Sequence, residues 1–100
     1  MRRVVWSGEA LEELEDAMEF VGTESVSARH KLVERIKSAL VALAEMPIGR
    51  QGRVKGSYEW YVKRTGYIVA YSLDETSLHV LHVIHGARDW PEDAWPSGDA

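Results

Sequence analysis

The sequence predicts an α+β domain in which a helical hairpin packs on one face of an antiparallel sheet. Two observations support this fold class. Apolar residues between Ser7 and Pro47 recur with the helical period of about 3.6 residues, whereas after the segment MPIGRQGR they alternate with the two-residue period of a strand. Helices and strands therefore occupy separate stretches of the chain, which favours α+β architecture over an alternating α/β one.

The first expected elements are a short strand and a helix. Arg3 to Trp6 is rich in β-branched and aromatic residues, so it is expected to form a strand. Ser7 suits the N-cap of the following helix, Glu9 is favourable in its first turn, and Gly22 ends it. Its apolar stripe consists of Ala10, Leu11, Leu14, Ala17, Met18 and Val21.

A second helix is expected after a short connection. Either Ser25 or Ser27 can cap it, and Pro47 stops it because proline restricts the residue before it to extended conformations. Its apolar positions are Ala28, Leu32, Ile36, Ala39, Leu40 and Leu43. The short connection predicts that the two helices form an antiparallel hairpin.

The remainder is predicted to form three sequential antiparallel strands, at about Ser57–Lys63, Tyr67–Leu73 and Ser77–His85. Hairpin turns are indicated at Thr65-Gly66 and at Asp74-Glu75. Helices on one side leave the opposite face of the sheet uncovered, which on a small domain indicates a partner or a substrate. The first strand presents on that face either Tyr58, Trp60 and Val62 or Glu59, Tyr61 and Lys63.

Histidines recur at every third position of the last strand, which raises the question of a metal site. Strand geometry places His79 and His85 about 20 Å apart, so no single ion can bridge them. His79 and His82 are therefore expected to be structural, whereas His85 stays open because it lies at the strand end. Alternation predicts one face formed by His79, Leu81, Val83 and His85 and the other by Leu78, Val80, His82 and Ile84.

Length and composition indicate one domain. A chain of 100 residues with 45% hydrophobic residues can build one modest core, expected over residues 1–96 with a loose tail at 97–100. The absence of cysteine excludes a disulfide framework, and no apolar stretch has the length of a membrane span. These features predict a soluble cytoplasmic protein.

Charge is segregated along the chain behind a net value of −4. Residues 1–24 carry a net charge of −5, residues 25–73 carry +6, and residues 74–100 carry −5. A basic middle attracts either an acidic partner or a phosphate backbone, but the negative total opposes generic nucleic-acid binding. A simple solvated face is the alternative interpretation.

Four segments together resemble the ParE toxins of bacterial toxin–antitoxin modules, within the RelE/ParE superfamily. They are VVWSGEALEELEDAMEFV, LVALAEMPIGRQGRV, YEWYVKRTGYIVAYSLD and LHVLHVIHGARDWP. The resemblance covers about Val4 to Pro91. Its most specific parts are the Pro-x-Gly-Arg turn at Pro47 to Arg50, the YIVAY strand and the closing HGARDWP.

The resemblance implies a β-α-α-β-β-β fold and a toxin that needs no cofactor, no metal and no catalytic residue. ParE toxins inhibit DNA gyrase by stabilising its cleaved-DNA complex. They are neutralised in a hetero-oligomer by a ParD-like antitoxin whose C-terminal part folds along the toxin. Direct sequence-specific binding of nucleic acid by this chain is not expected.

A second function class is RNA cleavage by a ribosome-dependent endoribonuclease of the RelE type, which has the same fold. That chemistry needs a base, cations on the phosphate and an acid. The candidates are His85, Arg88, Lys55, Lys63, Arg64 and Glu59. The C-terminal segment DWPEDAWPSGDA opposes this class, because it has no tyrosine and its acids would repel an RNA backbone. A third interpretation is an interaction domain without toxicity.

Under the ParE interpretation, Arg88, Trp90 and Trp95 are the candidate contacts to the target. The candidate antitoxin contacts are Trp6, Leu11, Leu14, Met18, Arg50 and Trp60. Structural interpretations stay open for several of them. Arg88 can pair with Asp89 or with a helix carboxylate, Trp90 can pack over the end of the sheet, and Trp6 and Trp60 can belong to the core.

Overall fold

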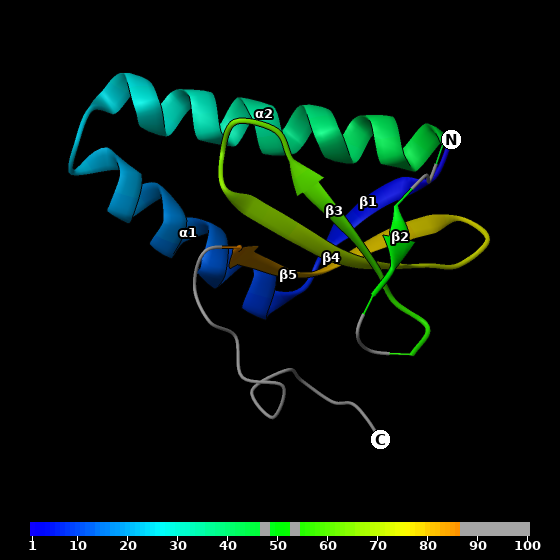
Figure 1. The fold of residues 1–100 in the computed structure, drawn as a ribbon. Coiled ribbons are helices and arrows are strands. Elements are labelled where there is room, and N and C mark those ends of the chain that lie inside the picture. Colours follow the sequence, from blue (N-terminus) through cyan, green and yellow to red (C-terminus); the bar gives the residue numbers. More distant parts are fainter. Residues whose placement is uncertain (47–48, 53–54, 87–100) are drawn as a thin grey trace.

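Two helices pack against a five-stranded sheet whose strands come from both ends of the chain (Figure 1). The computed structural model describes residues 1–46, 49–52 and 55–86, so the predicted tail at 97–100 lies outside the described residues. In chain order the elements are β1 (Arg3–Trp6), α1 (Gly8–Gly22), α2 (Val26–Glu45), β2 (Arg50–Gln51), β3 (Tyr58–Val62), β4 (Tyr67–Leu73) and β5 (Ser77–His85). The predicted α+β class and the helical hairpin are confirmed.

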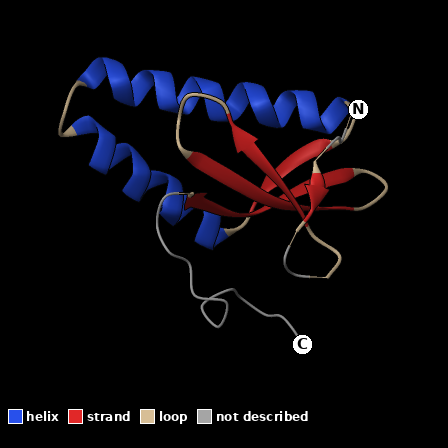
Figure 2. Cartoon of the chain, viewed as in Figure 1, coloured by secondary structure: helices blue, strands red, loops and turns tan. Residues whose placement is uncertain are grey.

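The strands lie in the order β1-β5-β4-β3-β2 (Figure 2). β3, β4 and β5 pair sequentially and antiparallel, which confirms the predicted meander. β1 pairs in parallel with β5, so the first strand lies beside the last. The two-residue strand β2 was not predicted from the sequence, and it extends the sheet beyond β3.

Serine side chains begin both helices. The Ser7 hydroxyl oxygen accepts a hydrogen bond from the Ala10 N–H at 3.0 Å, and the Ser25 hydroxyl oxygen accepts one from the Ala28 N–H at 2.9 Å. Each bond satisfies one of the backbone donors that a helix start leaves without an intrahelical partner. Of the two predicted caps for α2, the structure selects Ser25 over Ser27.

The core lies between the helices and the inner face of the sheet. Tyr71 is fully buried there, and its ring stacks on that of Tyr58 with the centroids 5.6 Å apart. Val62 is buried, and Tyr58 and Trp60 pack partly buried against the same cluster. The outer face of β3 is therefore the one with Tyr61, whose side chain is 52% exposed. This decides between the two orientations that the sequence left open.

A β-bulge interrupts the pairing of β4 with β5. Ala70 pairs with His82, but the next residue, Tyr71, pairs with Val80, so the register skips Leu81. The predicted alternation of faces along the last strand is therefore wrong beyond this point. Val80 and Val83 both belong to the core cluster, although strict alternation would place them on opposite faces.

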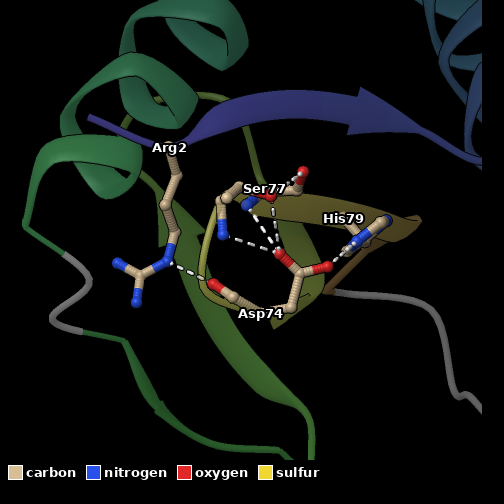
Figure 3. Close-up of polar contacts among 5 residues, drawn as sticks. Arg2, Asp74, Ser77 and His79 are labelled. Carbon is tan, nitrogen blue, oxygen red and sulfur yellow. Dashed lines mark hydrogen bonds and ion pairs between the residues drawn. The ribbon is translucent and has the colours of Figure 1, made fainter.

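The turn between β4 and β5 is built around the Asp74 carboxylate (Figure 3). One carboxylate oxygen accepts hydrogen bonds from the backbone N–H groups of Thr76 at 2.9 Å and Ser77 at 2.7 Å, and the other contacts His79 Nε2 at 2.8 Å. The Arg2 Nε group donates to the Asp74 carbonyl at 2.8 Å and ties the N-terminus to the turn. The hydrogen bond from His79, followed by those from the backbone, lowers the pKa of Asp74 from 3.8 to about 2.

This geometry predicts an acid dependence of stability. Because the folded-state pKa is depressed, ionised Asp74 stabilises the fold above pH 3.8, and this contribution is lost as the pH falls towards about 2. Replacing Asp74 with Asn should flatten the pH dependence of the free energy of unfolding between pH 3.8 and about pH 2. Urea titration at several pH values measures this dependence. Glu75→Gln, a change in the same turn, is the control. Equal flattening in both variants would contradict the assignment.

Candidate functional site

A groove of about 880 Å³ lies between α2 and β3. Its floor is apolar and is formed by Ala39, Ala42, Leu43, Trp60 and Val62. The α2 residues at the groove follow helical spacing, since positions 35, 39, 42 and 46 are neighbours on one helix face. That face lies beside the core stripe, and its small alanine side chains leave the space next to Trp60 open.

Charge is distributed unevenly along the groove. Arg35, Lys63 and Arg64 line the end next to the turn between β3 and β4, together with the carboxylate of Glu34. Glu45 lines the other end, ten residues further along α2 and therefore about 15 Å away. The groove thus has an excess of positive charge at one end and a carboxylate at the other.

The sheet edge beside this groove is only partly covered. β2 pairs with Tyr58 and Glu59 of β3, and no other described strand continues it along residues 60–62. The Gly52 N–H donates to the Ser57 carbonyl at 2.8 Å, so the backbone groups of Ser57 point towards β2. Because these groups alternate in direction along a strand, those of Tyr61 also point outward, beyond the end of β2. An apolar groove therefore borders a strand edge at Tyr61 that no strand in the described part of the chain covers.

Gly49 and Arg50 are the described part of the Pro-x-Gly-Arg motif, whose Pro47 and Ile48 lie outside the described residues. The Gly49 N–H donates to the Tyr71 hydroxyl at 3.0 Å, and a Cβ at this position would overlap that hydroxyl. Burial raises the pKa of Tyr71 above its usual value of 10.0. The next residue, Arg50, has an exposed guanidinium 3.7 Å from the buried carboxylate of Glu59. Glycine is thus required by close packing, and Arg50 is held beside the edge of β3.

Comparisons with known proteins agree on one family. The family described as "ParE toxin of type II toxin-antitoxin system, parDE" matches residues 4–90. The chain belongs to the ParE toxin family. The family resemblance expected from the sequence is therefore confirmed.

Two relatives of this ParE-family chain carry toxin names. The chain is 32% identical over 92 residues to "Putative toxin Y4kP" of Sinorhizobium fredii, which covers 91% of this chain and 95% of the relative. It is 29% identical over 89 residues to "Toxin RelE2" of Caulobacter vibrioides, which covers 88% of this chain and 99% of the relative.

Solved structures share the fold. The chromosomal ParDE system of P. aeruginosa matches with a TM-score of 0.77 at 16% identity, over 85% of this chain and 96% of that one. The toxin–antitoxin complex DinJ–YafQ of E. coli matches with a TM-score of 0.61 at 21% identity, over 86% of this chain and 93% of that one. The YoeB dimer of Staphylococcus aureus matches with a TM-score of 0.56 at 15% identity, over 81% of this chain and 92% of that one. At these identities the likeness concerns the fold alone.

The predicted antitoxin contacts fall into different environments. Trp60 lines the groove, and Arg50 is exposed beside β3. Leu11 is 46% exposed on α1, whereas Leu14 is only 9% exposed and belongs to the core. We therefore assign Leu14 to packing. Trp6 and Met18 are partly buried against the core. The groove residues on α2 were not predicted as a site, although their spacing was visible in the sequence.

The predicted nuclease residues are spread over the sheet. His85 of β5 and Val62 of β3 both pair with Tyr67 of β4, so His85 lies at the same end of the sheet as the turn with Lys63 and Arg64, but with β4 between them. The ring centroids of His85 and Tyr67 are 4.8 Å apart in an edge-on arrangement. Glu59 pairs with Ala70, three positions from that end. Lys55 lies in the loop that leads into β3. The described members of the set do not converge on one point.

Arg88, Trp90 and Trp95, the predicted target contacts, lie outside the described residues. Among the described residues, no cluster of histidine and acidic side chains could hold a metal ion, and no helix could span a membrane.

His82 has a structural partner that was not predicted from the sequence. Its Nδ1 lies 3.1 Å from both carboxylate oxygens of Glu13, and one of these oxygens accepts the Val83 N–H at 2.9 Å. Glu13 comes from α1 and does not belong to the apolar stripe that the sequence predicted for this helix. Because β1 ends opposite Val80, this carboxylate supplies the acceptor that a longer strand would have supplied.

A mutant cycle tests the packing of Gly49 under Tyr71. Gly49→Ala should lower the free energy of unfolding by about 1 to 3 kcal/mol, because the added Cβ overlaps the buried hydroxyl. In a Tyr71→Phe background the same change should cost less, since the atom nearest to the added Cβ is gone, although the Glu59 carbonyl oxygen, 2.9 Å from that Cβ, remains. Gly8→Ala, where nothing lies within 4 Å of the added Cβ, is the control. Equal costs of Gly49→Ala in both backgrounds, measured by urea denaturation, would contradict this packing.

Proposed function

We propose that this ParE-family toxin poisons DNA gyrase in the cytoplasm and that a ParD-like antitoxin neutralises it by occupying the groove between α2 and β3. The observation that carries the antitoxin part is the joint presence, on one side of the molecule, of an apolar groove and a strand edge that no described strand covers. A helix can lay its apolar face on Ala39 and Ala42, and an extended segment can pair with the edge at Tyr61.

Two further facts support an antitoxin at this place. Two structural neighbours are a ParDE system and the DinJ–YafQ toxin–antitoxin complex, so proteins of this fold occur with antitoxins. The described part of the groove is also large enough, at about 880 Å³, to accept several side chains of a partner. Burial of that apolar surface would supply a hydrophobic driving force.

The gyrase part of the proposal is supported by the family and by the separation of Glu59 from His85 among the described nuclease candidates. RelE-type cleavage needs a base, an acid and phosphate-binding cations around one scissile bond. Here Glu59 is 4% exposed and lies near the Arg50 guanidinium. Glu59 pairs with Ala70 of β4, whereas His85 pairs with Tyr67, three residues away along that strand. A toxin that inhibits an enzyme by binding to it requires no such constellation.

A pair of adjacent substitutions on α2 tests the antitoxin site. Ala42 lies in the groove and is exposed, while its neighbour Val41 is 50% exposed outside the groove lining. Ala42→Glu should weaken binding of the cognate ParD-like antitoxin by about tenfold or more, because it places a charge on the apolar floor. Val41→Glu should leave the affinity within about twofold of the parent.

Isothermal titration calorimetry at several temperatures gives both the affinity and the heat-capacity change, which should be negative for burial of an apolar surface. Thermal unfolding of the free variants checks that both are folded. Loss of affinity in Val41→Glu equal to that in Ala42→Glu would place the antitoxin elsewhere.

Enzyme assays test the gyrase target. Purified toxin should inhibit supercoiling by gyrase and cause linear DNA to accumulate, and added antitoxin should reverse both effects. Codon-specific cleavage of mRNA in a translation extract, abolished by His85→Ala, would instead establish the endoribonuclease function. The readouts are agarose gels of plasmid DNA and primer extension on mRNA.

A further inference from the structure

The basic end of the groove has cations that lack carboxylate partners in the described part of the chain. Arg35, Lys63 and Arg64 line this end, and the Arg35 Nη1 group donates to the Arg64 carbonyl at 3.4 Å. Of the ion pairs among the described residues, none includes any of these three side chains. Two guanidinium groups and an ammonium group are thus gathered where an apolar floor ends.

Arg64 has an unusual backbone conformation for its residue type. Among the described residues other than glycine, it alone has a positive φ, at 67°. This left-handed region is adopted readily by glycine and by asparagine, but a side chain such as arginine is strained there. The turn therefore has a long cationic side chain at a position where glycine would remove the backbone strain. Backbone strain of this kind is characteristic of binding positions.

We propose that Arg35, Lys63 and Arg64 form a carboxylate-binding site that recognises an acidic residue of the peptide segment in the groove. This inference rests on the proposed function, because the segment is that of the antitoxin. Guanidinium groups bind carboxylates through paired hydrogen bonds, and a bound carboxylate offsets the repulsion between neighbouring cations. The carboxylate of Glu34 reduces the positive charge at this end but leaves an excess of two.

The two ends of the groove also fix the direction of the segment. Its acidic residue lies at the turn between β3 and β4, its apolar residues lie on Ala39, Ala42 and Trp60, and a basic residue lies near Glu45, about 15 Å away. That separation corresponds to about ten residues if the segment is helical and to about four or five if it is extended.

A peptide carboxylate fits this site better than a phosphate of nucleic acid. Nucleic-acid sites align several cations along a backbone, whereas here the cations stop at an apolar floor that suits leucine-like side chains. The net charge of −4 also opposes binding to a polyanion. A short acidic and apolar segment satisfies both parts of the groove at once.

Arg64→Gly is the decisive variant, because it removes the cation and at the same time the strain that a positive φ causes at a residue with a side chain. Its thermal midpoint should equal or exceed that of the parent. Its affinity for the cognate ParD-like antitoxin should nevertheless fall by about tenfold, and the affinity should depend less on salt concentration. Arg64→Lys should retain part of the affinity, because lysine keeps the charge but not the planar fork.

Lys37→Ala is the matched control, since Lys37 is an exposed cation on α2 outside the groove lining. It should change the antitoxin affinity by less than about twofold. An equal loss in Lys37→Ala and Arg64→Gly would indicate a general charge effect and would overturn the carboxylate site. A lower thermal midpoint in Arg64→Gly would assign Arg64 to the fold and would also overturn it.

Ala42→Glu separates failure of this inference from failure of the proposed function. If Ala42→Glu weakens antitoxin binding but Arg64→Gly does not, the groove binds the antitoxin without the carboxylate site. If neither variant weakens binding, the antitoxin does not occupy the groove and both proposals fail. If Arg64→Gly weakens binding to a DNA or RNA duplex and leaves the antitoxin affinity unchanged, the cations serve nucleic acid, and the proposal is wrong.

Discussion

The contact between the Tyr71 hydroxyl and the backbone of Gly49 is the constraint on which the far edge of the sheet depends. Tyr71 is fully buried, its ring stacks on Tyr58 of the next strand, and its hydroxyl accepts the Gly49 N–H at 3.0 Å. Gly49 is thereby fixed beside β3, directly before β2 begins. Arg50 follows immediately and reaches the buried carboxylate of Glu59. One aromatic side chain thus connects the core to the surface beside the groove.

The two edges of the sheet are completed in different ways. Beyond the end of β1, the edge of β5 is covered by groups from the start of α1: the Ser7 N–H donates to the Val80 carbonyl at 3.0 Å, and Glu13 accepts the Val83 N–H at 2.9 Å. On the opposite side, β2 reaches only Tyr58 and Glu59, so the outward backbone groups of Tyr61 face no described strand. An open edge is a place where a second chain can add a strand. The proposed antitoxin site follows from this asymmetry.

Part of the candidate site could be predicted from residue types. Trp60 and Arg50 were singled out in the sequence; the structure places Trp60 on β3 at the groove and Arg50 opposite Glu59, where β2 pairs with β3. The basic end of the groove was not predicted as a unit, because Arg35 lies on a helix about thirty residues before Arg64 and their proximity depends on how α2 crosses the sheet. The strain at Arg64 is equally invisible in the sequence, since φ is set by the closure of the turn.

The sequence by itself determined the helices, the antiparallel meander and the family, because hydrophobic period, capping residues and turn signals are local. The Pro-x-Gly-Arg motif was likewise visible before its reason was known. Only the tertiary structure decided the parallel pairing of β1 with β5, the bulge that skips Leu81, and the use of Glu13 as an edge acceptor. Each of these joins residues that are distant in the chain or depends on a strand neighbour. Backbone hydrogen bonds and packing across the sheet select them, and local propensity does not.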